Sequence, residues 1–392
     1  MTARRALVVL LCSASVAACG GGDSVSSHLA TDAGSRPDAA AEHDDARPND
    51  SAADAPAHAA PDARRPSDTG SDALAVAPLA ATPNQWNWTY IPGSSCADGT
   101  QTGFAVNPAP SPSTDVLLFL EGGGACWDAT SCWGPASTAF YVATGYGQTE
   151  FETDPQVTAI YLLDRTSANN PFAKMNLVYV PYCTGDVFAG SNVTDLDYLG
   201  VTHSTHFVGY DNLTLYLRYV AATFEGTSRV WLAGDSAGGF GAALNFEHVQ
   251  GALPGARVDV LDDSGQPIEP APGLWKTWTT AWNMQLPSGC AGCQADPGAF
   301  VAYYSAKYPS QRFGLISYQY DVVISPFLDL TLTQFNTELY ALAANMDAGW
   351  VNGHYFVIPG SSHVGLLAPS AALMTWVQAM VSDDPSWASS KP

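Results

Sequence analysis

The chain has few basic residues and no long apolar run after its N-terminus. Its 392 residues include 15 Lys and Arg against 37 Asp and Glu, which gives a formal net charge of −22. Nucleic acids and anionic membrane surfaces are bound by basic patches, so we expect neither as a partner. Because no later stretch is apolar enough to span a bilayer, membrane association would depend on the N-terminal segment alone.

That N-terminal segment has the pattern of a secretory signal peptide over residues 1–18. Arg4 and Arg5 form a short positive region, and an apolar run too short to cross a bilayer follows them. Val16-Ala17-Ala18-Cys19 is typical of a bacterial lipobox, which predicts cleavage before Cys19 and lipid attachment to it. The alternative is an ordinary signal peptide in which Cys19 has no role. We therefore expect an exported protein that is lipid-anchored at the bacterial cell envelope or surface.

Aromatic residues are absent from residues 20–81, where Ala, Asp, Pro, Ser and Gly dominate. Such a stretch cannot bury enough apolar surface to offset the entropy that is lost on folding. We predict a disordered tether over residues 19–81, followed by a single domain over residues 82–392.

Six cysteines lie in the predicted domain, and an even number in an exported protein suggests three disulfides. They are Cys96, Cys126, Cys132, Cys183, Cys290 and Cys293. Cys126 with Cys132 and Cys290 with Cys293 are natural local pairs, which leaves Cys96 to pair with Cys183. Because these cysteines lack a matching His-x-His or a second Cys-x-x-Cys, we expect no metal site.

Short apolar runs alternate with helical patterns along the domain. Strands are predicted at 116–120, 177–180, 230–233, 258–261, 313–320 and 355–358, and helices at 211–224, 237–249, 332–346 and from 369 onward. Continuous apolar runs are typical of strands that are buried on both faces. We therefore predict an α/β fold of the α/β-hydrolase type, with a mainly parallel central sheet and helices on both faces.

Gly234-Asp235-Ser236-Ala237-Gly238-Gly239 follows one predicted strand and begins one predicted helix. A Gly-x-Ser-x-Gly in this place is the nucleophile elbow of α/β-hydrolases. The serine of such an elbow occupies a strained turn, so its flanking positions need almost no side chain. We predict Ser236 as a nucleophile; the alternative is a glycine-rich turn that happens to contain a serine.

In α/β-hydrolases an acid and then a base follow the nucleophile along the chain, each after a strand. His363 lies in a loop of small residues after the last predicted strand, and we predict it as the base. Asp321 follows the preceding strand and is the preferred acid, with Asp263 as the alternative. Four other histidines are less well placed to be the base: His203, His206, His248 and His354. Three aspartates could instead cap helices or shape turns: Asp262, Asp263 and Asp329.

Glu121-Gly122-Gly123-Gly124 follows the predicted strand 116–120. Three glycines allow backbone N–H groups to turn inward without a side chain that blocks an ester carbonyl. With the N–H of Ala237 they would form an oxyanion hole. The segment has neither Gly-Lys-Ser/Thr nor the Gly-x-Gly-x-x-Gly spacing, which argues against a phosphate-binding loop.

Several motifs occur in one order along the domain. They are Leu120-Glu121-Gly-Gly-Gly-Ala-Cys126, the Cys126/Cys132 spacing, Asn169-Asn170-Pro171-Phe172, Tyr182-Cys183-Thr184-Gly185-Asp186, Gly234 to Gly239, and Asp263-Ser264-Gly265. This series resembles the pectin acetylesterase/Notum family of carboxylesterases, from about Trp88 to the C-terminal helix. The resemblance implies a nucleophile at Ser236, an acid at Asp321, a base at His363 and oxyanion donors at Gly123, Gly124 and Ala237.

The chain departs from the family pattern beside this site. Ala125 stands where plant members have an aromatic residue, and Asp235 stands where they have a cysteine. We expect Trp127 and Asp235 to line the substrate pocket, with Trp133 and Phe188 as further candidates, although aromatic residues more often belong to the core.

The resemblance implies a serine esterase that removes a short acyl group, above all acetyl, from an extracellular polysaccharide, a similar polymer or a small ester. The alternatives are a lipase-like deacylase or polyester depolymerase for longer acyl chains, and a non-catalytic glycan-binding lipoprotein. We expect a monomer with neither cofactor nor metal.

Overall fold

The computed structural model describes residues 76–392. The predicted signal peptide, the predicted lipid attachment site and most of the predicted tether lie outside these residues. The domain begins a few residues earlier than predicted, because Leu79 and Ala81 already pack against the core. The N–H of Leu79 also donates a hydrogen bond to Thr223 Oγ1 at 2.9 Å, which ties this end of the predicted tether to the domain.

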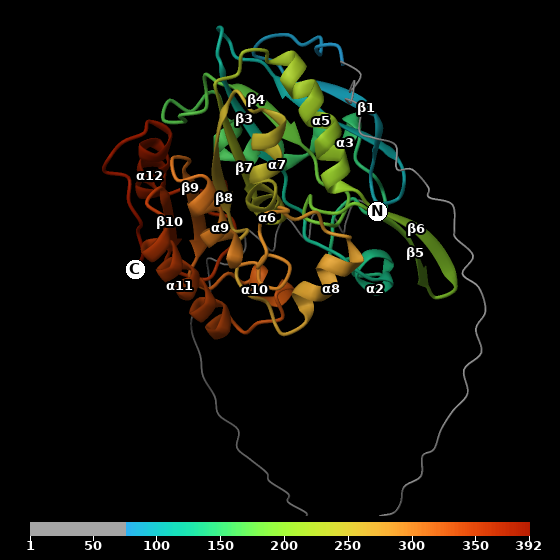
Figure 1. Cartoon of the computed structure of the whole chain (residues 1–392). Coiled ribbons are helices and arrows are strands. Elements are labelled where there is room, and N and C mark those ends of the chain that lie inside the picture. The colour runs from blue at the N-terminus through green and yellow to red at the C-terminus, as the bar shows by residue number, and fades with distance from the viewer. Residues whose placement is uncertain (1–75) are drawn as a thin grey trace, which may run out of the picture. The chain divides into compact units, whose positions relative to one another are not determined.

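An eight-stranded sheet forms the centre of the domain, in the order β1-β2-β4-β3-β7-β8-β9-β10 (Figure 1). The strands are β1 Asn87–Ser95, β2 Gln101–Asn107, β3 Asp115–Leu120, β4 Asn176–Val180, β7 Arg229–Asp235, β8 Arg257–Asp263, β9 Phe313–Tyr318 and β10 Gly353–Ile358. Neighbours from β4 to β10 are parallel, while β1 and β2 add an antiparallel edge that the sequence prediction lacks. The predicted mainly parallel sheet is therefore confirmed.

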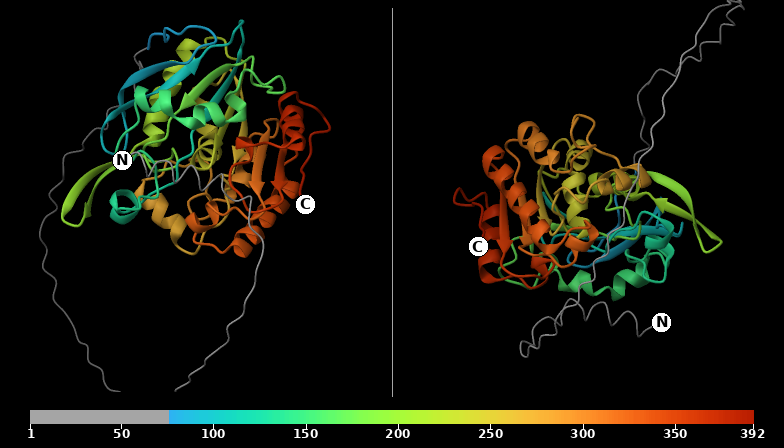
Figure 2. Two further views of the ribbon diagram at one scale, coloured as in Figure 1. Left: turned by 180° about the vertical axis from the view of Figure 1, so that it is seen from behind. Right: turned by 90° about the horizontal axis from the view of Figure 1, so that it is seen from below.

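Both faces of the sheet are buried, because alternate side chains of a strand belong to two different cores. In β3, Val116 and Leu118 belong to one core, and Leu117 and Phe119 to the other. Five helices cover the first core: α5 Gly209–Thr223, α6 Ala237–Leu244, α7 Phe246–Ala252, α9 Ala299–Lys307 and α11 Leu332–Gly349. Three helices and two 3₁₀ turns cover the second core: α3 Gln148–Thr153, α4 Pro155–Ala159, α12 Ala371–Val381, η1 Tyr161–Leu163 and η2 Gly365–Leu367. Helices thus cover both faces, as predicted (Figures 1 and 2).

The helix predicted over residues 237–249 is two helices, α6 and α7. Asn245 lies between them, and its buried side chain donates to the carbonyl oxygens of Gly241 at 2.9 Å and Phe188 at 3.0 Å. A side chain that competes for backbone carbonyls in this way interrupts a helix.

Loops gather at the carboxyl ends of the parallel strands. The short helices α2 Ala129–Trp133, α8 Leu274–Ala281 and α10 Ile324–Phe327 follow β3, β8 and β9, and they lie along the lower edge of the domain in Figure 1. A hairpin of β5 Asn192–Tyr198 and β6 Val201–Phe207 projects beside α2 (Figures 1 and 2). Residues that end different strands can therefore meet at this edge.

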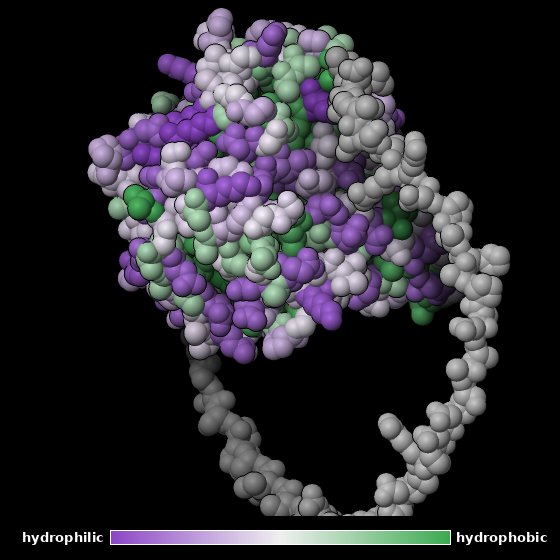
Figure 3. Space-filling view, viewed as in Figure 1, coloured by the Kyte–Doolittle hydropathy of each residue, from purple (hydrophilic) through white to green (hydrophobic). Residues whose placement is uncertain are grey.

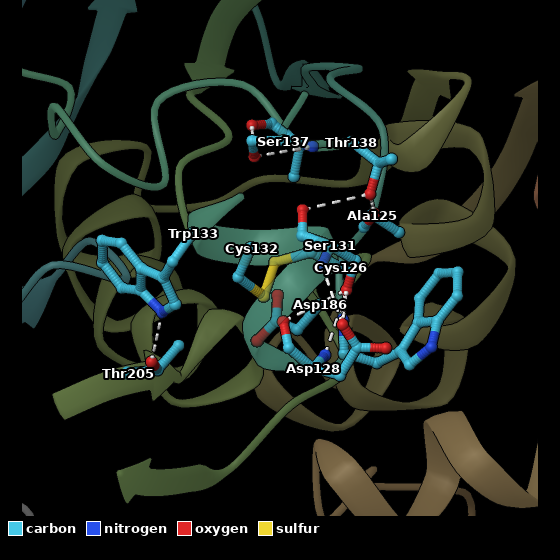
Figure 4. Close-up of a disulfide and its surroundings, with 12 residues drawn as sticks. Ala125, Cys126, Asp128, Ser131, Cys132, Trp133, Ser137, Thr138, Asp186 and Thr205 are labelled. Carbon is cyan, nitrogen blue, oxygen red and sulfur yellow. Dashed lines mark hydrogen bonds between the residues drawn. A yellow bond between two sulfur atoms is a disulfide. The ribbon is translucent and has the colours of Figure 1, made fainter. Parts of the chain in front are cut away.

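Three disulfides join the six cysteines of the domain in the predicted pairs, Cys96–Cys183, Cys126–Cys132 and Cys290–Cys293. The pair Cys126–Cys132 fastens α2 to the segment that follows β3 (Figure 4). The N–H of Cys126 donates to Gly185 O at 2.9 Å, and its carbonyl accepts from Trp282 Nε1 at 2.8 Å. This bonding fits a protein from an oxidising compartment.

Within residues 76–392, no helix is both long and apolar enough to cross a membrane. The same residues contain no group of three His, Cys, Asp or Glu side chains that could hold a metal ion. On the face seen in Figure 3, hydrophilic and hydrophobic residues are interspersed.

Candidate active site

Ser236 occupies the turn between β7 and α6. Its backbone has φ 53° and ψ −119°, a strained conformation for a residue with a side chain. The turn requires its glycines, because a Cβ on Gly234 would lie 2.2 Å from Gly238 O and a Cβ on Gly238 would lie 1.9 Å from Leu120 O. The predicted strand, turn and helix are therefore present.

His363 follows β10 and is hydrogen-bonded to Asp321, which follows β9. Its Nδ1 lies 2.8 Å from Asp321 Oδ2, and the two side chains are 9% and 0% exposed. The other oxygen, Asp321 Oδ1, accepts from the N–H groups of Val323 and Ile324, each at 2.9 Å, which fixes the carboxylate. When Nδ1 donates to this carboxylate, Nε2 of the neutral ring is left to accept a proton.

Asp263, the alternative acid of the sequence analysis, binds the loop of the histidine instead of its ring. Its Oδ1 accepts from the N–H of Gly365 at 3.0 Å, and its Oδ2 accepts from the N–H of Leu366 at 2.7 Å. Its backbone carbonyl accepts from the N–H of Ser236 at 2.8 Å. One residue thus connects the turn of Ser236 with the loop of His363, so both lie at the same edge of the sheet.

The three glycines after β3 lie close to this turn. A Cβ on Gly122 would be 3.1 Å from the Cβ of Ser236, and a Cβ on Gly123 would be 2.7 Å from the ring of Tyr182. Gly124 has φ +78°, in the left-handed region that favours glycine. Side chains at these positions would collide with the turn or strain the backbone.

The backbone N–H groups of these glycines differ in their partners. The N–H of Gly122 donates to Asp235 Oδ1 at 3.0 Å. Within the described chain, no acceptor takes the N–H of Gly123, Gly124 or Ala237, the first residue of α6. These three donors are free for the oxygen of a ligand, as an oxyanion hole requires.

Three carboxylates act on His363. Burial alone would lower the pKa of His363, but Asp321, Asp263 and Asp235 together raise it above its ordinary value. Burial and the charge of Asp263 raise the pKa of Asp235 to about 7. Burial likewise raises the pKa of Asp263 to about 6, in spite of the N–H groups that its carboxylate accepts. The site therefore favours positive charge on the imidazole and disfavours additional negative charge.

The two residues expected to line a pocket have different surroundings. Asp235 is 4% exposed, and its carboxylate contacts the backbone of Gly122, so it lies behind the glycines and not in an open pocket. Trp127 is half-buried and packs on Trp278 of α8, with ring centroids 5.5 Å apart.

The other aromatic candidates also have partners within the domain. Trp133 stacks on His203 of the hairpin at 4.1 Å, and its Nε1 donates to Thr205 Oγ1 at 2.9 Å (Figure 4). Phe188 is buried against Tyr182. The remaining histidines bond to side chains outside the site: His206 to Ser95, His248 to Asn245 and Thr214, and His354 to Ser389.

Two phenylalanines beside the glycines were not predicted. The N–H of Phe140 donates to Gly123 O at 2.8 Å, and its side chain is 43% exposed. A Cβ on Gly124 would lie 3.2 Å from the ring of Phe327. Both come from segments without a regular apolar pattern, so no signal in the sequence places them here.

A scan against protein families matches the description Pectinacetylesterase over residues 84–321, a range that contains Ser236 and Asp321. The chain is 28% identical over 251 residues to palmitoleoyl-protein carboxylesterase NOTUM of Drosophila melanogaster, a match that covers 58% of this chain and 35% of that protein. It is 30% identical over 247 residues to palmitoleoyl-protein carboxylesterase notum1' of Xenopus laevis, covering 56% and 47%. The chain therefore spans less than half the length of these curated relatives.

Two crystal structures of the Wnt deacylase Notum from Drosophila are similar to the domain. Their TM-scores are 0.51 and 0.53 at 21% and 20% identity, and the matches cover 74% of this chain and 86% and 87% of those chains. At this identity the likeness shows the fold alone, which is the predicted α/β-hydrolase type. Because the family match covers more than half of the chain, the protein belongs to the pectinacetylesterase family.

Proposed function

We propose that this protein is a serine carboxylesterase that removes short acyl groups, above all acetyl, from an uncharged extracellular polymer. The observation that carries the proposal is the 2.8 Å contact between Asp321 and His363 at the sheet edge that also holds Ser236. The unpaired N–H groups of Gly123, Gly124 and Ala237 support it further, because acyl transfer develops negative charge on the carbonyl oxygen.

The proposed cycle uses each of these groups once per half-reaction. Ser236 Oγ attacks the ester carbon while His363 Nε2 takes its proton, and Asp321 holds the ring in the tautomer that allows this. The resulting imidazolium protonates the leaving alcohol, and an acyl-enzyme remains on Ser236. A water molecule deprotonated by His363 then releases the acid.

In the described chain, Ser236 Oγ makes no hydrogen bond, and its residue is 8% exposed. Contacts between a nucleophile and its base commonly tighten only when substrate is bound. The proposal therefore requires that the hydroxyl approaches Nε2 in the complex with an ester.

The charge of the protein bears on the polymer. The net charge of −22 and the carboxylates of Asp235 and Asp263 beside the base would repel a polyanion. De-esterified pectin is such a polyanion, so we propose a neutral acetylated polymer, with small neutral esters as further substrates.

A second candidate is a deacylase for longer chains. Exposed apolar side chains flank the site: Phe140 beside Gly123, Val322 after Asp321, and Leu367 at the end of the histidine loop, with 43%, 45% and 37% of their surfaces exposed. Such residues would contact a long acyl chain, and the relatives named above carry palmitoleoyl in their names.

Covalent labelling tests the reaction class. A fluorophosphonate probe should label the wild-type protein, and the variant Ser236→Ala should not be labelled. An unlabelled wild-type protein would favour a binding protein without catalysis.

A series of p-nitrophenyl esters separates the two acyl classes. A kcat/KM that falls steeply beyond butyrate supports the short-chain proposal, whereas a rise toward octanoate supports the alternative. Acetate release from neutral acetylated glycans should exceed release from acetylated polygalacturonate, and the reverse order would contradict the proposed polymer.

We also propose that the protein is exported as a monomer and anchored to the cell envelope by lipid on Cys19. The three disulfides support export. Incorporation of labelled fatty acid that is lost in Cys19→Ser would support the anchor, and equal incorporation would contradict it.

A further inference from the structure

The residue before the proposed nucleophile is a buried aspartate. Asp235 ends β7 and is 4% exposed. It is in register with Asp263 of β8, another buried carboxylate, and no salt bridge of the described chain includes it. Burial of a carboxylate without a compensating cation is unfavourable for stability.

The side chain of Asp235 is directed at the glycine segment of the proposed oxyanion hole. Its Oδ1 accepts the N–H of Gly122 at 3.0 Å. A Cβ on Gly122 would meet Asp235 Oδ2 at 2.9 Å and Asp235 O at 2.8 Å. Asp235 therefore contacts this glycine with its carboxylate and its backbone.

Among the residues that the structure describes, the N–H group of Gly122 has a hydrogen-bond partner, and the N–H groups of the next two glycines do not. The N–H of Gly122 is taken by Asp235, while those of Gly123 and Gly124 have no acceptor in the described chain. The path of Gly122 determines where these next two peptide groups lie, because the segment consists of glycines with little conformational preference of their own.

We propose that Asp235 is a positioning residue of the oxyanion hole. Its carboxylate holds the N–H of Gly122 and thereby directs the N–H groups of Gly123 and Gly124 at the carbonyl oxygen of an ester on Ser236. The proposal rests on the proposed esterase function.

Two substitutions at residue 235 separate this role from a structural one. In Asp235→Asn the amide oxygen can still accept the N–H of Gly122, so kcat/KM should stay within about 3-fold of the wild type. In Asp235→Ala the glycine segment loses its anchor, and kcat should fall about 100-fold with little change in KM, as on loss of an oxyanion donor. Both values are taken per active site, counted by fluorophosphonate titration.

Asp262→Asn is the matched control. Asp262 is also fully buried at the end of a strand, but its Oδ1 accepts the N–H of Gly265 and not one from the glycine segment. We expect its kcat per active site to stay within about 2-fold of the wild type. If Asp235→Ala fails to fold, Asp235→Ser replaces it, because a serine side chain is shorter and carries no charge.

The outcomes separate a failure of the proposed function from a failure of the proposed role of Asp235. A wild-type protein that the fluorophosphonate does not label would overturn the proposed function, and the role of Asp235 with it. A labelled wild type with equal kcat in Asp235→Ala would overturn only the role of Asp235. Equal losses in Asp235→Asn and Asp235→Ala would also overturn it, because rescue by the amide is what a hydrogen bond to Gly122 requires.

Discussion

Strands β7 and β8 begin with arginines and end with aspartates. The buried carboxylates at the two ends have different partners. At the amino end, Asp259 is fully buried between two guanidinium groups: Arg229 Nε lies 2.7 Å from Oδ2, and Arg257 Nη2 lies 2.9 Å from Oδ1. The backbone N–H of Arg312 donates to the same carboxylate at 2.6 Å. Every oxygen of this buried carboxylate has a cationic or N–H partner.

The same arginines also bind Asp383, which follows α12. Arg229 Nη1 lies 2.7 Å from Oδ2, and Arg312 Nε lies 3.2 Å from Oδ1. Although burial opposes it, the arginines hold the pKa of Asp383 below its usual value. The amino end thus fastens the C-terminal helix to the sheet with a nearly balanced set of charges.

At the carboxyl end, Asp235, Asp263 and Asp321 share one histidine and no arginine. Burial raises the pKa of Asp235 to about 7 and of Asp263 to about 6. A site with unbalanced negative charge is less favourable for folding, but it stabilises an imidazolium as it forms on His363. One set of strands therefore carries stability at one end and the proposed chemistry at the other.

The largest expected effect is on catalysis and comes from Asp321→Asn. The amide can keep the bonds from Val323 and Ile324 but then turns an NH₂ group toward His363 Nδ1, which favours the wrong tautomer. We expect kcat to fall about 10⁴-fold with a nearly unchanged melting temperature.

Asp329→Asn is the control for this change. Asp329 is exposed and has φ 53°, a conformation that asparagine tolerates, so both kcat and the melting temperature should match the wild type. If the variant Asp321→Asn kept the wild-type kcat, Asp321 would not belong to the proposed triad.

The next effect is on stability and comes from the amino end. Asp259→Asn leaves the guanidinium groups of Arg229 and Arg257 without their buried partner, so the free energy of unfolding should fall by roughly 3–5 kcal/mol. In contrast, kcat per active site should change less than about 2-fold, because the site lies at the other end of the strands. Denaturant unfolding and active-site titration measure the two quantities.

Asp383→Asn provides the matched comparison. Its side chain is 45% exposed, so we expect a loss of only about 1 kcal/mol. Were Asp259→Asn to reduce kcat as strongly as it reduces stability, the two ends would be coupled and the comparison would fail.

Asp263→Asn should affect both quantities moderately. One amide hydrogen must face the N–H of Gly365 or Leu366, so one bond that holds the loop of His363 is lost. We expect kcat/KM to fall about 10- to 100-fold, because small displacements of a base are costly. A kcat/KM equal to that of Asp262→Asn would show that the loop keeps its position without Asp263.

Residues that end strands were the predictable part of the site. Ser236 and His363 follow continuous apolar runs, and the chain order of α/β-hydrolases then gives each a role. Asp263 and Asp321 both end or follow such runs, so the sequence leaves two acids open. Only the folded chain shows that Asp321 reaches the ring whereas Asp263 reaches two backbone N–H groups of the loop.

Other features depend on contacts that no local pattern records. The antiparallel strand β1 and the hairpin β5–β6 mix polar and apolar residues, so they lack the continuous apolar runs of the parallel strands. The break at Asn245 depends on its bond to Phe188, which is distant in sequence. We expected Asp235 to line the pocket because it departs from the family pattern beside the nucleophile, but its side chain instead accepts the N–H of Gly122.

The last expected effect is a dependence of stability on pH that originates at the carboxyl end. Burial raises the pKa of Asp235 from an ordinary value of 3.8 to about 7, so between these values the folded protein holds a proton that the unfolded chain releases. This contribution is fully present below about pH 4 and is lost as the pH rises through about 7. Relative to Asp235→Asn, the wild type should therefore lose unfolding free energy, roughly 1 kcal/mol for each pH unit between about pH 5 and pH 7. The control Asp329→Asn should show the same dependence of unfolding free energy on pH as the wild type. If the curves of unfolding free energy against pH were parallel for the wild type and Asp235→Asn, the carboxyl of Asp235 would be ionised throughout this range. The negative charge at the carboxyl end would then be greater than inferred.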